Sequence, residues 1–342
     1  MNKTAPLVTA PPEAAPASAR PARASLPGRI LLALANSREL MLLALIVILA
    51  VGMTTVYPNN FPTTYNISAV LLNAAQNGIL VAGMMLLMIG GSFDLSVGST
   101  LALAGVWAGV VVGWWGWPAP LGLLAALIVG GLAGAANGAI VTRLGINALI
   151  ATLATMTIYR GLTYLTAGTG VTPIGDNYAA YGETVVLGIQ TPFWVMLAIV
   201  VIGGWAIAKT RFFRQFYFIG GNARAAKLSG IRVERLTLIG FTIMGLLAGL
   251  AGALAASRLN SAVVSAGIGV ELSVITATVL GGASLKGGEG TILGGVFGVL
   301  FIALVQNAMI ITGIGVFWQP IVVGAVLLLA VSLDRYKQAH RG

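Results

Sequence analysis

Residues 209–235 read KTRFFRQFYFIGGNARAAKLSGIRVER, and the chain on both sides of this basic segment is almost wholly apolar. The segment holds seven of the nineteen Lys and Arg residues of the chain, against one acidic residue, Glu234. Basic residues gather in the cytoplasmic loops of membrane proteins. The basic segment is therefore either an ordinary loop between two membrane spans or such a loop with a docking surface for a partner.

The basic segment contains the signals of a short helix. Gly220-Gly221 interrupts any preceding helix, and Asn222 is a favourable N-cap. Residues 223–229 then give about two helical turns, roughly 10 Å long, and Gly230 is suited to the left-handed conformation that ends many helices. We expect the small residues Ala223, Ala226 and Gly230 to form a contact face, while the basic residues mainly fix orientation in the membrane.

Composition places the chain among membrane proteins. Its 342 residues are 58% hydrophobic and only 8% charged, whereas soluble chains carry about 25% charged residues. Several apolar runs reach the ~17–25 residues that cross a bilayer as a helix. These observations predict an all-α polytopic membrane protein.

The chain has no cysteine and one histidine, His340, so we expect no cofactor, no metal site and no Cys- or His-based catalytic centre. The net charge of +10 is spread over short segments between apolar runs, which argues against nucleic-acid binding.

Ten membrane spans are predicted from the apolar runs, and the basic residues orient them. The spans cover about residues 41–57, 66–90, 99–117, 121–141, 146–167, 193–208, 236–257, 270–283, 291–312 and 318–333. The eighth is short, and we expect it to be broken or re-entrant. With a cytoplasmic N-terminus, seventeen Lys and Arg residues lie inside and only Arg160 and Arg258 outside. Both termini are therefore predicted to be cytoplasmic.

The same topology defines the expected domain organisation. Residues 1–39, rich in Ala and Pro near the start, are predicted to be a disordered cytoplasmic tail. Residues 40–336 form the transmembrane domain, and 337–342 are a second cytoplasmic tail. Spans 2–5 and spans 7–10 form two sets of four. The first spans of the two sets, 2 and 7, cross the membrane in opposite directions, which permits an inverted repeat.

Glycines punctuate both halves of the chain. Gly-Gly pairs occur in GGSFDLSVGS (90–99) and GGASLKGGEG (281–290), at places that are not equivalent in the two sets of spans. We interpret these pairs as local turn chemistry. Small residues spaced four apart are typical of close helix packing in membranes. They occur as Gly134/Gly138, Gly245/Gly249 and Gly290/Gly294/Gly298.

Neutral polar side chains within the predicted spans are candidates for lining a solute path. Asn73, Gln76 and Asn77 are spaced i, i+3, i+4 and so share one helix face. The other candidates are Thr152, Thr155, Asn307, Phe317 and Gln319. Amides that bond hydroxyl groups, together with aromatic faces, suit a neutral polyhydroxylated ligand. For each residue the alternative is an ordinary hydrogen bond between neighbouring helices.

Asp94 is the acidic residue in the long interval between Glu39 and Asp176. A charge at the centre of a membrane helix costs about 2.5–3.5 kcal/mol on insertion scales. That cost falls if the carboxylate caps the third span by accepting from the amide of Ser96 or Val97. Asp94 and Ser96 are therefore candidates either for a helix cap at the inner interface or for an inner gate.

Four passages, in order and spacing, resemble the permease subunits of ribose/xylose/arabinose/galactose-type bacterial ABC importers. They are GGSFDLSVGS (90–99), ALIATLATMTIYRGLTYLTAGTGV (148–171), FIGGNARAAKLSGIRVER (218–235) and GLLAGLAGALAASRLNSAVVSAGIGVELSVITATVLGGASLKGGEGTILGG (245–295). The resemblance covers about residues 40–336. It implies a homodimer of ten-span subunits in the bacterial cytoplasmic (inner) membrane, with an ABC ATPase below and a periplasmic sugar-binding protein above.

The resemblance also implies that a short cytoplasmic helix of the permease fits a groove in the ATPase. In this chain the helix lies within the basic segment, and its small face is then expected to meet the ATPase. The expected ATPase-coupling residues are Gly220, Gly221, Asn222, Ala223, Arg224, Ala225, Ala226, Lys227, Ser229 and Gly230.

The predicted function is thus that of a permease subunit rather than an enzyme. A sugar-like substrate, a monosaccharide or related polyol, would be carried inward by alternating access. Another chain would hydrolyse the ATP, because GGWAIAKT (203–210) has Ala208 where a phosphate-binding loop needs its second glycine. The alternative is a stand-alone secondary transporter or channel for a neutral polar solute, which would need no docking helix. A membrane-embedded enzyme would need a cluster of reactive side chains that the sequence lacks.

Overall fold

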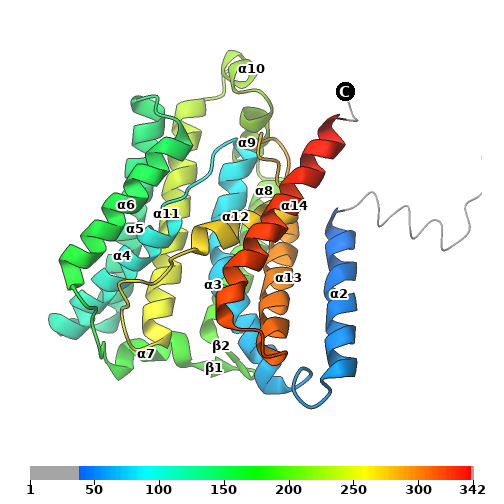
Figure 1. Ribbon diagram of the computed structural model, residues 1–342. Coiled ribbons are helices and arrows are strands. Elements are labelled where there is room, and N and C mark those ends of the chain that lie inside the picture. Colours follow the sequence, from blue (N-terminus) through cyan, green and yellow to red (C-terminus); the bar gives the residue numbers. More distant parts are fainter. Residues whose placement is uncertain (1–37, 340–342) are drawn as a thin grey trace, which may run out of the picture. The chain divides into compact units, whose positions relative to one another are not determined.

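The computed structural model describes the backbone of residues 38–339 and the side chains of residues 39–332, and its regular structure is almost all helical (Figure 1). The elements are α2 (Arg38–Val56), α3 (Thr64–Ile89), α4 (Val97–Gly109), the π-helix η1 (Val110–Trp114), α5 (Ala119–Arg143), α6 (Ala148–Ala167), α7 (Asp176–Glu183), β1 (Val185–Val186), β2 (Ile189–Gln190), α8 (Thr191–Lys209), α9 (Arg211–Gly221), α10 (Ala223–Leu228), α11 (Val233–Arg258), α12 (Val270–Leu280), α13 (Ile292–Ile311), the 3-10 helix η2 (Val316–Trp318) and α14 (Gln319–Ala339). A helix therefore lies over each of the ten predicted spans.

Seven helices in the part of the chain that the structure describes are long and apolar enough to cross a bilayer. They are α2, α3, α4 with η1, α5, α8, α11 and α13. Two further segments, Val270–Leu280 and Val316–Ser332, are apolar but shorter. The expected shortness of the eighth span is confirmed, because α12 has 11 residues. The chain is therefore an all-α membrane protein of the multi-pass type.

The predicted tails lie mostly outside the described residues. Residues 1–37 and 340–342 are not described. At the two boundaries the helices reach further than predicted: α2 already begins at Arg38, and α14 continues to Ala339.

Helix α3 runs through the core of the fold. All of its residues from Gly78 to Ile89 are buried, and it contacts α8, α11, α12 and α13. A helix that is apolar all round is expected in such a surrounded position. The N-terminal half, up to Asn77, keeps exposed and half-buried side chains among its buried ones. One helix thus has a sealed half and an accessible half.

Glycines bring α5 and α11 into direct backbone contact. A Cβ atom built on Gly134 would overlap the carbonyl oxygen of Phe241, and one on Gly245 would overlap that of Gly130. Backbones approach this closely in membrane helices only where side chains are absent. The interpretation of Gly134/Gly138 and Gly245/Gly249 as packing positions is confirmed.

The third glycine series behaves in two ways. A Cβ on Gly294 would overlap Gly281 O, and one on Gly298 would overlap Ala277 O, so these two positions pack α13 against α12 and the turn after it. Gly290 lies in the preceding loop with φ +143° and faces the Met85 side chain. It is therefore a loop residue rather than part of the helix seam.

Local capping chemistry sets several helix starts. Thr63, Asn147, Thr210, Asn222 and Thr291 each accept a hydrogen bond from a backbone N–H in the first turn of α3, α6, α9, α10 and α13, respectively. These bonds satisfy donors that have no partner inside the helix. Figure 1 shows that α10 lies at one end of the helical bundle, whereas α7 and the strands β1 and β2 lie at the other.

Candidate functional site

A cavity of about 790 Å³ lies beside the accessible half of α3. Its lining comes from residues 64–79 of α3, the β1–β2 hairpin, the first turn of α8, the last turns of α11 and the start of α12. This volume falls within the range of about 300–1,000 Å³ that is usual for small-molecule sites. The cavity is at the α7 and β1–β2 end of the bundle.

Three predicted path residues meet in this cavity. Asn73, Gln76 and Asn77 all belong to its lining, as their shared helix face predicted. Asn73 is exposed, and the other two are half-buried. Their amides present both donors and acceptors to the cavity.

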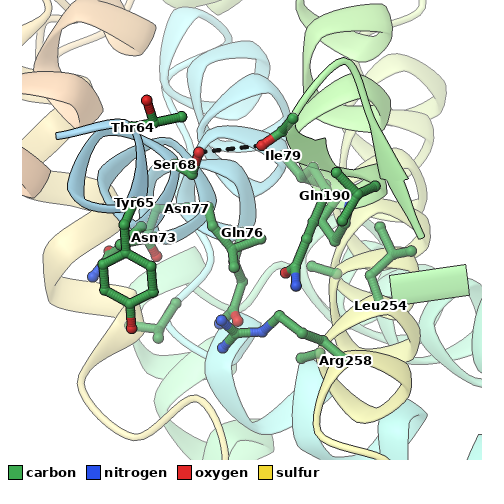
Figure 2. A pocket seen from close by; sticks show the side chains of 18 residues that line it. Thr64, Tyr65, Ser68, Asn73, Gln76, Asn77, Ile79, Gln190, Leu254 and Arg258 are labelled. Atoms are coloured by element: carbon green, nitrogen blue, oxygen red, sulfur yellow. Dashed lines mark hydrogen bonds between the residues drawn. The ribbon is translucent and has the colours of Figure 1, made fainter. Parts of the chain in front are cut away.

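Two further polar residues of the cavity were not predicted as path residues. Gln190 comes from β2 and Arg258 from the last turn of α11, and both belong to the lining. Figure 2 shows the Gln76, Gln190 and Arg258 side chains converging on the same space. The Oε1 atom of Gln190 is buried and has no hydrogen-bond partner within the described chain. A buried acceptor without a partner is rare, and one beside a cavity is suited to a hydroxyl group of a ligand.

The position of Gln190 is fixed by a tight hairpin. Val185 pairs with Gln190 and Val186 with Ile189, and the turn residues Leu187 and Gly188 have φ values of 51° and 80°. Two successive positive φ values match the turn type that best joins two twisted strands. The Ser68 hydroxyl donates to Gly188 O at 3.2 Å, dashed in Figure 2, which ties the hairpin to α3.

The cavity is polar but carries little charge. Arg258 is the one charged residue of its lining, and the remaining polar members are amides, hydroxyls and Tyr65. A cation would find no carboxylate among these residues. Neutral hydroxyl groups would find amide acceptors and donors together with an aromatic ring, so the arrangement suits a small, neutral, polar solute.

The other predicted path residues lie elsewhere. Thr152 and Thr155 are buried in α6, and their hydroxyls donate to carbonyl groups of their own helix, Ala148 O at 2.8 Å and Thr152 O at 3.3 Å. Asn307 forms a reciprocal amide pair with Asn66, at 2.6 and 3.1 Å. The remaining two, Phe317 and Gln319, are at η2 and the start of α14. None of the five lines this cavity, so a path role for them stays a prediction.

Asp94 sits in a buried polar cluster that joins α4, α5 and α6. Its Oδ1 accepts from Ser96 N at 2.8 Å and from Ser96 Oγ at 2.6 Å, so the predicted bond to Ser96 N is present, but Ser96 precedes the first residue of α4 and no side chain caps that helix. Asn137 donates to Ser96 Oγ at 2.8 Å and approaches Asp94 Oδ2 at 3.3 Å. The Tyr159 hydroxyl donates to Asn137 Oδ1 at 3.2 Å. Sequence reasoning missed Asn137 and Tyr159, and the gate role of Asp94 and Ser96 stays a prediction.

The short helix predicted within the basic segment is present as α10. Asn222 Oδ1 accepts from Ala225 N at 3.0 Å, and Gly230 has φ 83°, as their cap positions require. Residues 221–230 are exposed with one exception, Ala226, which is 4% exposed. The expected contact face of Ala223, Ala226 and Gly230 is therefore wrong at Ala226, because the chain itself covers that side chain. Leu228, 85% exposed, is the large apolar residue that α10 presents outward.

Comparison with known proteins identifies the family. A family model described as "Branched-chain amino acid transport system / permease component" matches residues 66–331. The chain belongs to this permease family. The ribose import permease protein RbsC of Escherichia coli K12 is 39% identical over 302 residues, which cover 87% of this permease and 93% of the relative. The L-arabinose transport system permease protein AraH of the same organism is 41% identical over 292 residues, covering 83% and 86%. RbsC of Bacillus subtilis is 41% identical over 284 residues, covering 82% and 88%.

These relatives confirm the resemblance seen in the four sequence passages. The permease is accordingly a transport protein rather than an enzyme, and a multi-pass protein of the bacterial inner membrane. No solved structure gives a significant match to the chain.

Proposed function

We propose that this permease is the membrane subunit of an ATP-binding-cassette importer that carries a monosaccharide or related polyol inward. A separate cytoplasmic ATPase would drive it by alternating access, and a periplasmic binding protein would deliver the sugar. The names of its relatives support the sugar class, since they are described as ribose and arabinose permeases. The proposal includes ten spans, cytoplasmic termini, two four-span repeats and a homodimer.

The observation that carries the proposal is the position of α10 relative to the cavity. An exposed, capped helix of six residues lies at one end of the bundle, and a cavity lined by neutral polar groups lies at the other. A transporter driven from outside its own chain needs both a docking element and a solute site, on opposite sides of the membrane. A stand-alone carrier would have no use for α10.

The burial pattern of α3 supports an outward-open state. Its half beside the cavity is accessible, whereas Gly78–Ile89 is sealed by neighbouring helices. In the proposed topology the accessible half faces the periplasm. ATP-driven movement of α10 would then have to open the sealed half while closing the cavity, which is what alternating access requires.

The docking role of α10 is tested in proteoliposomes that contain the permease, its ATPase and its binding protein. Uptake of a panel of radiolabelled pentoses, hexoses and polyols is measured with and without ATP. Arg224→Glu reverses an exposed charge of α10, and Gly221→Trp adds bulk where the structure leaves nothing within 4 Å. Both should lower uptake by at least about tenfold, because a lost docking hot spot removes about 2 kcal/mol or more. Arg143→Glu, at an exposed basic residue that ends α5, is the charge-matched control.

The outcomes separate the proposal from its rival. Loss of uptake in both α10 variants with a normal control supports an ABC importer. Normal uptake in both variants, or a preparation from which no ATPase chain co-purifies, contradicts it. Uptake that proceeds in vesicles without ATP would instead indicate a secondary transporter or channel.

A further inference from the structure

Gly-Gly pairs from three distant parts of the sequence meet at the α10 end of the bundle. Gly91 follows α3, Gly220 lies in the last turn of α9, and Gly287-Gly288 lies in the loop between α12 and α13. A Cβ atom built on Gly287 would lie 2.8 Å from Gly220 Cα and 2.9 Å from Gly91 Cα. Gly288 N donates to Ile89 O at 2.9 Å. We call Gly91, Gly220, Gly287 and Gly288 the glycine joint.

The glycines of the joint are required for two different reasons. Gly91, Gly287 and Gly288 have φ values of 76°, 90° and 78°, which side chains rarely allow. Gly220 is different, because it lies within a helix, where glycine is unfavourable by about 0.5–1 kcal/mol relative to alanine. A Cβ there would overlap both Ile89 O and Gly288 N. Gly220 therefore serves close approach and not turn formation.

Helix α9 is also hydrogen-bonded to the loop between α12 and α13, one turn before Gly220. The Tyr217 hydroxyl donates to Gly290 O at 2.7 Å. Burial raises the pKa of Tyr217, so this hydroxyl remains protonated and available as a donor. The neighbouring Phe216 is 2% exposed and lies under Gly90 and Gly240, whose Cβ positions would be 3.0 Å from its ring.

Helix α10 follows directly from the joint. Asn222 alone separates the end of α9 from the start of α10. On its other side α10 is linked to α11 through the buried Ala226 and through an ion pair between Lys227 and Glu234, whose side chains are both more than half exposed. Exposed ion pairs contribute only about 0–1 kcal/mol. Backbone-to-backbone contacts without intervening side chains leave much less freedom, so the joint is the stiffer of the two connections.

We propose that the glycine joint transmits movement of α10 to α3. Gly220 is the positioning residue that holds α9 directly against the C-terminal end of α3. This inference rests on the proposed function of α10. A displacement of α10 passes through Gly220 to Ile89 and to the 287–288 loop at once. From Ile89 to Gln76 in the cavity is about 20 Å along α3, at 1.5 Å per residue, and Gly78–Ile89 is buried throughout. Movement at the joint therefore reaches the cavity.

The test compares Gly220→Ala with Gly204→Ala in the complete complex of permease, ATPase and binding protein. Gly204 also lies within a helix, α8, but a Cβ on it would meet nothing within 4 Å. The readout is the ratio of sugar imported to ATP hydrolysed, measured with the panel sugar that the wild-type complex imports fastest. A merely structural role would reduce the amount of assembled complex and leave this ratio unchanged.

For Gly220→Ala we expect the ATPase to co-purify, since α10 is unaltered, and the ratio to fall at least about fivefold, the lower end of usual coupling between sites. Gly204→Ala should keep the wild-type ratio. If Gly220→Ala does not assemble, the same ratio is measured for Tyr217→Phe. This variant removes only the hydroxyl that donates to Gly290 O, and it should also lower the ratio of sugar imported to ATP hydrolysed.

A wild-type ratio in assembled Gly220→Ala, or in Tyr217→Phe when the first variant fails to assemble, overturns the role of the joint. If Arg224→Glu still abolishes uptake in that case, the proposed function survives without the joint. If the wild-type complex shows no ATP-dependent uptake, the proposed function fails, and the joint inference falls with it.

Discussion

Replacing Asp94 by alanine should destabilise the permease, because the carboxylate ties the start of α4 to α5 from a buried position. Asp94 is 1% exposed, and every polar group that reaches it is a donor. In Asp94→Ala the Ser96 N–H loses its acceptor at 2.8 Å. Asn137 loses its contact at 3.3 Å but keeps Ser96 Oγ at 2.8 Å. The Ser96 hydroxyl loses its acceptor at 2.6 Å as well and keeps only Thr100 Oγ1, at 3.4 Å, as a further partner. Two donors of Ser96 thus lose their acceptor in a buried site.

The Ser96 N–H sets the magnitude, because the Ser96 hydroxyl still has Thr100 Oγ1 within 3.4 Å. A buried donor deprived of a charged acceptor costs about 2–3 kcal/mol. For a chain of 342 residues that corresponds to a fall of about 3–5 °C in the apparent melting temperature. Asp94→Asn keeps an oxygen for Ser96 N–H and gives up only the long Asn137 contact, so its loss should be about half as large.

The assay is thermal unfolding of the purified permease in one detergent at one scan rate, since membrane domains often unfold irreversibly. Asp176→Ala is the control, because this aspartate is exposed at the start of α7 and contributes less than about 1 kcal/mol there. The expected order of melting temperatures is wild type, then Asp94→Asn, then Asp94→Ala. The role assigned to the cluster would be refuted if the melting temperature of Asp94→Ala equalled that of the Asp176→Ala control or exceeded that of Asp94→Asn.

Three further predictions follow from other contacts. Gln190→Leu removes the unpaired amide at the cavity and should raise the KM of uptake by about 3–10-fold, the worth of one hydrogen bond; an unchanged KM would exclude Gln190 from solute binding. Gly245→Ala forces α11 away from α5 and should lower the melting temperature, whereas Gly161→Ala, with nothing within 4 Å, should not; equal melting of the two would contradict the close-contact seam. In a double-mutant cycle, Asn66→Ala and Asn307→Ala should show a coupling of about 1 kcal/mol, while additive losses would mean that the amide pair contributes nothing.

The helices were predictable because their signals are local. The bilayer sets the length of the apolar runs, so every predicted span falls on a helix. The same holds for α10: Asn222, Gly230 and the small residues between them act on their nearest neighbours, and the helix ends at Leu228, one residue before the predicted end. Caps and turns are specified by residues within one or two turns of each other.

The partners of polar side chains were not predictable, because they come from distant parts of the chain. Asn307 was expected on the solute path, but its amide is engaged by Asn66, 241 positions away. The glycine pairs show the same division. Interpreting Gly91 and Gly287 as turn residues agrees with their positive φ values, yet nothing local indicates that Gly220 lies between them.

The composition of α3 bears on where a sugar would leave the cavity. Beyond Asn77 the helix reads GILVAGMMLLMI to Ile89, without a single polar side chain. A hydroxyl group transferred into such surroundings without a new hydrogen bond loses about 2–7 kcal/mol, and a monosaccharide carries several. A path along the sealed half of α3 within one subunit would therefore be prohibitive for the proposed substrate. Polar partners for the inward step would then come from other elements or, in the proposed homodimer, from the second copy. In that proposal the apolar half of α3 would carry movement from the glycine joint, and the solute would pass between the subunits.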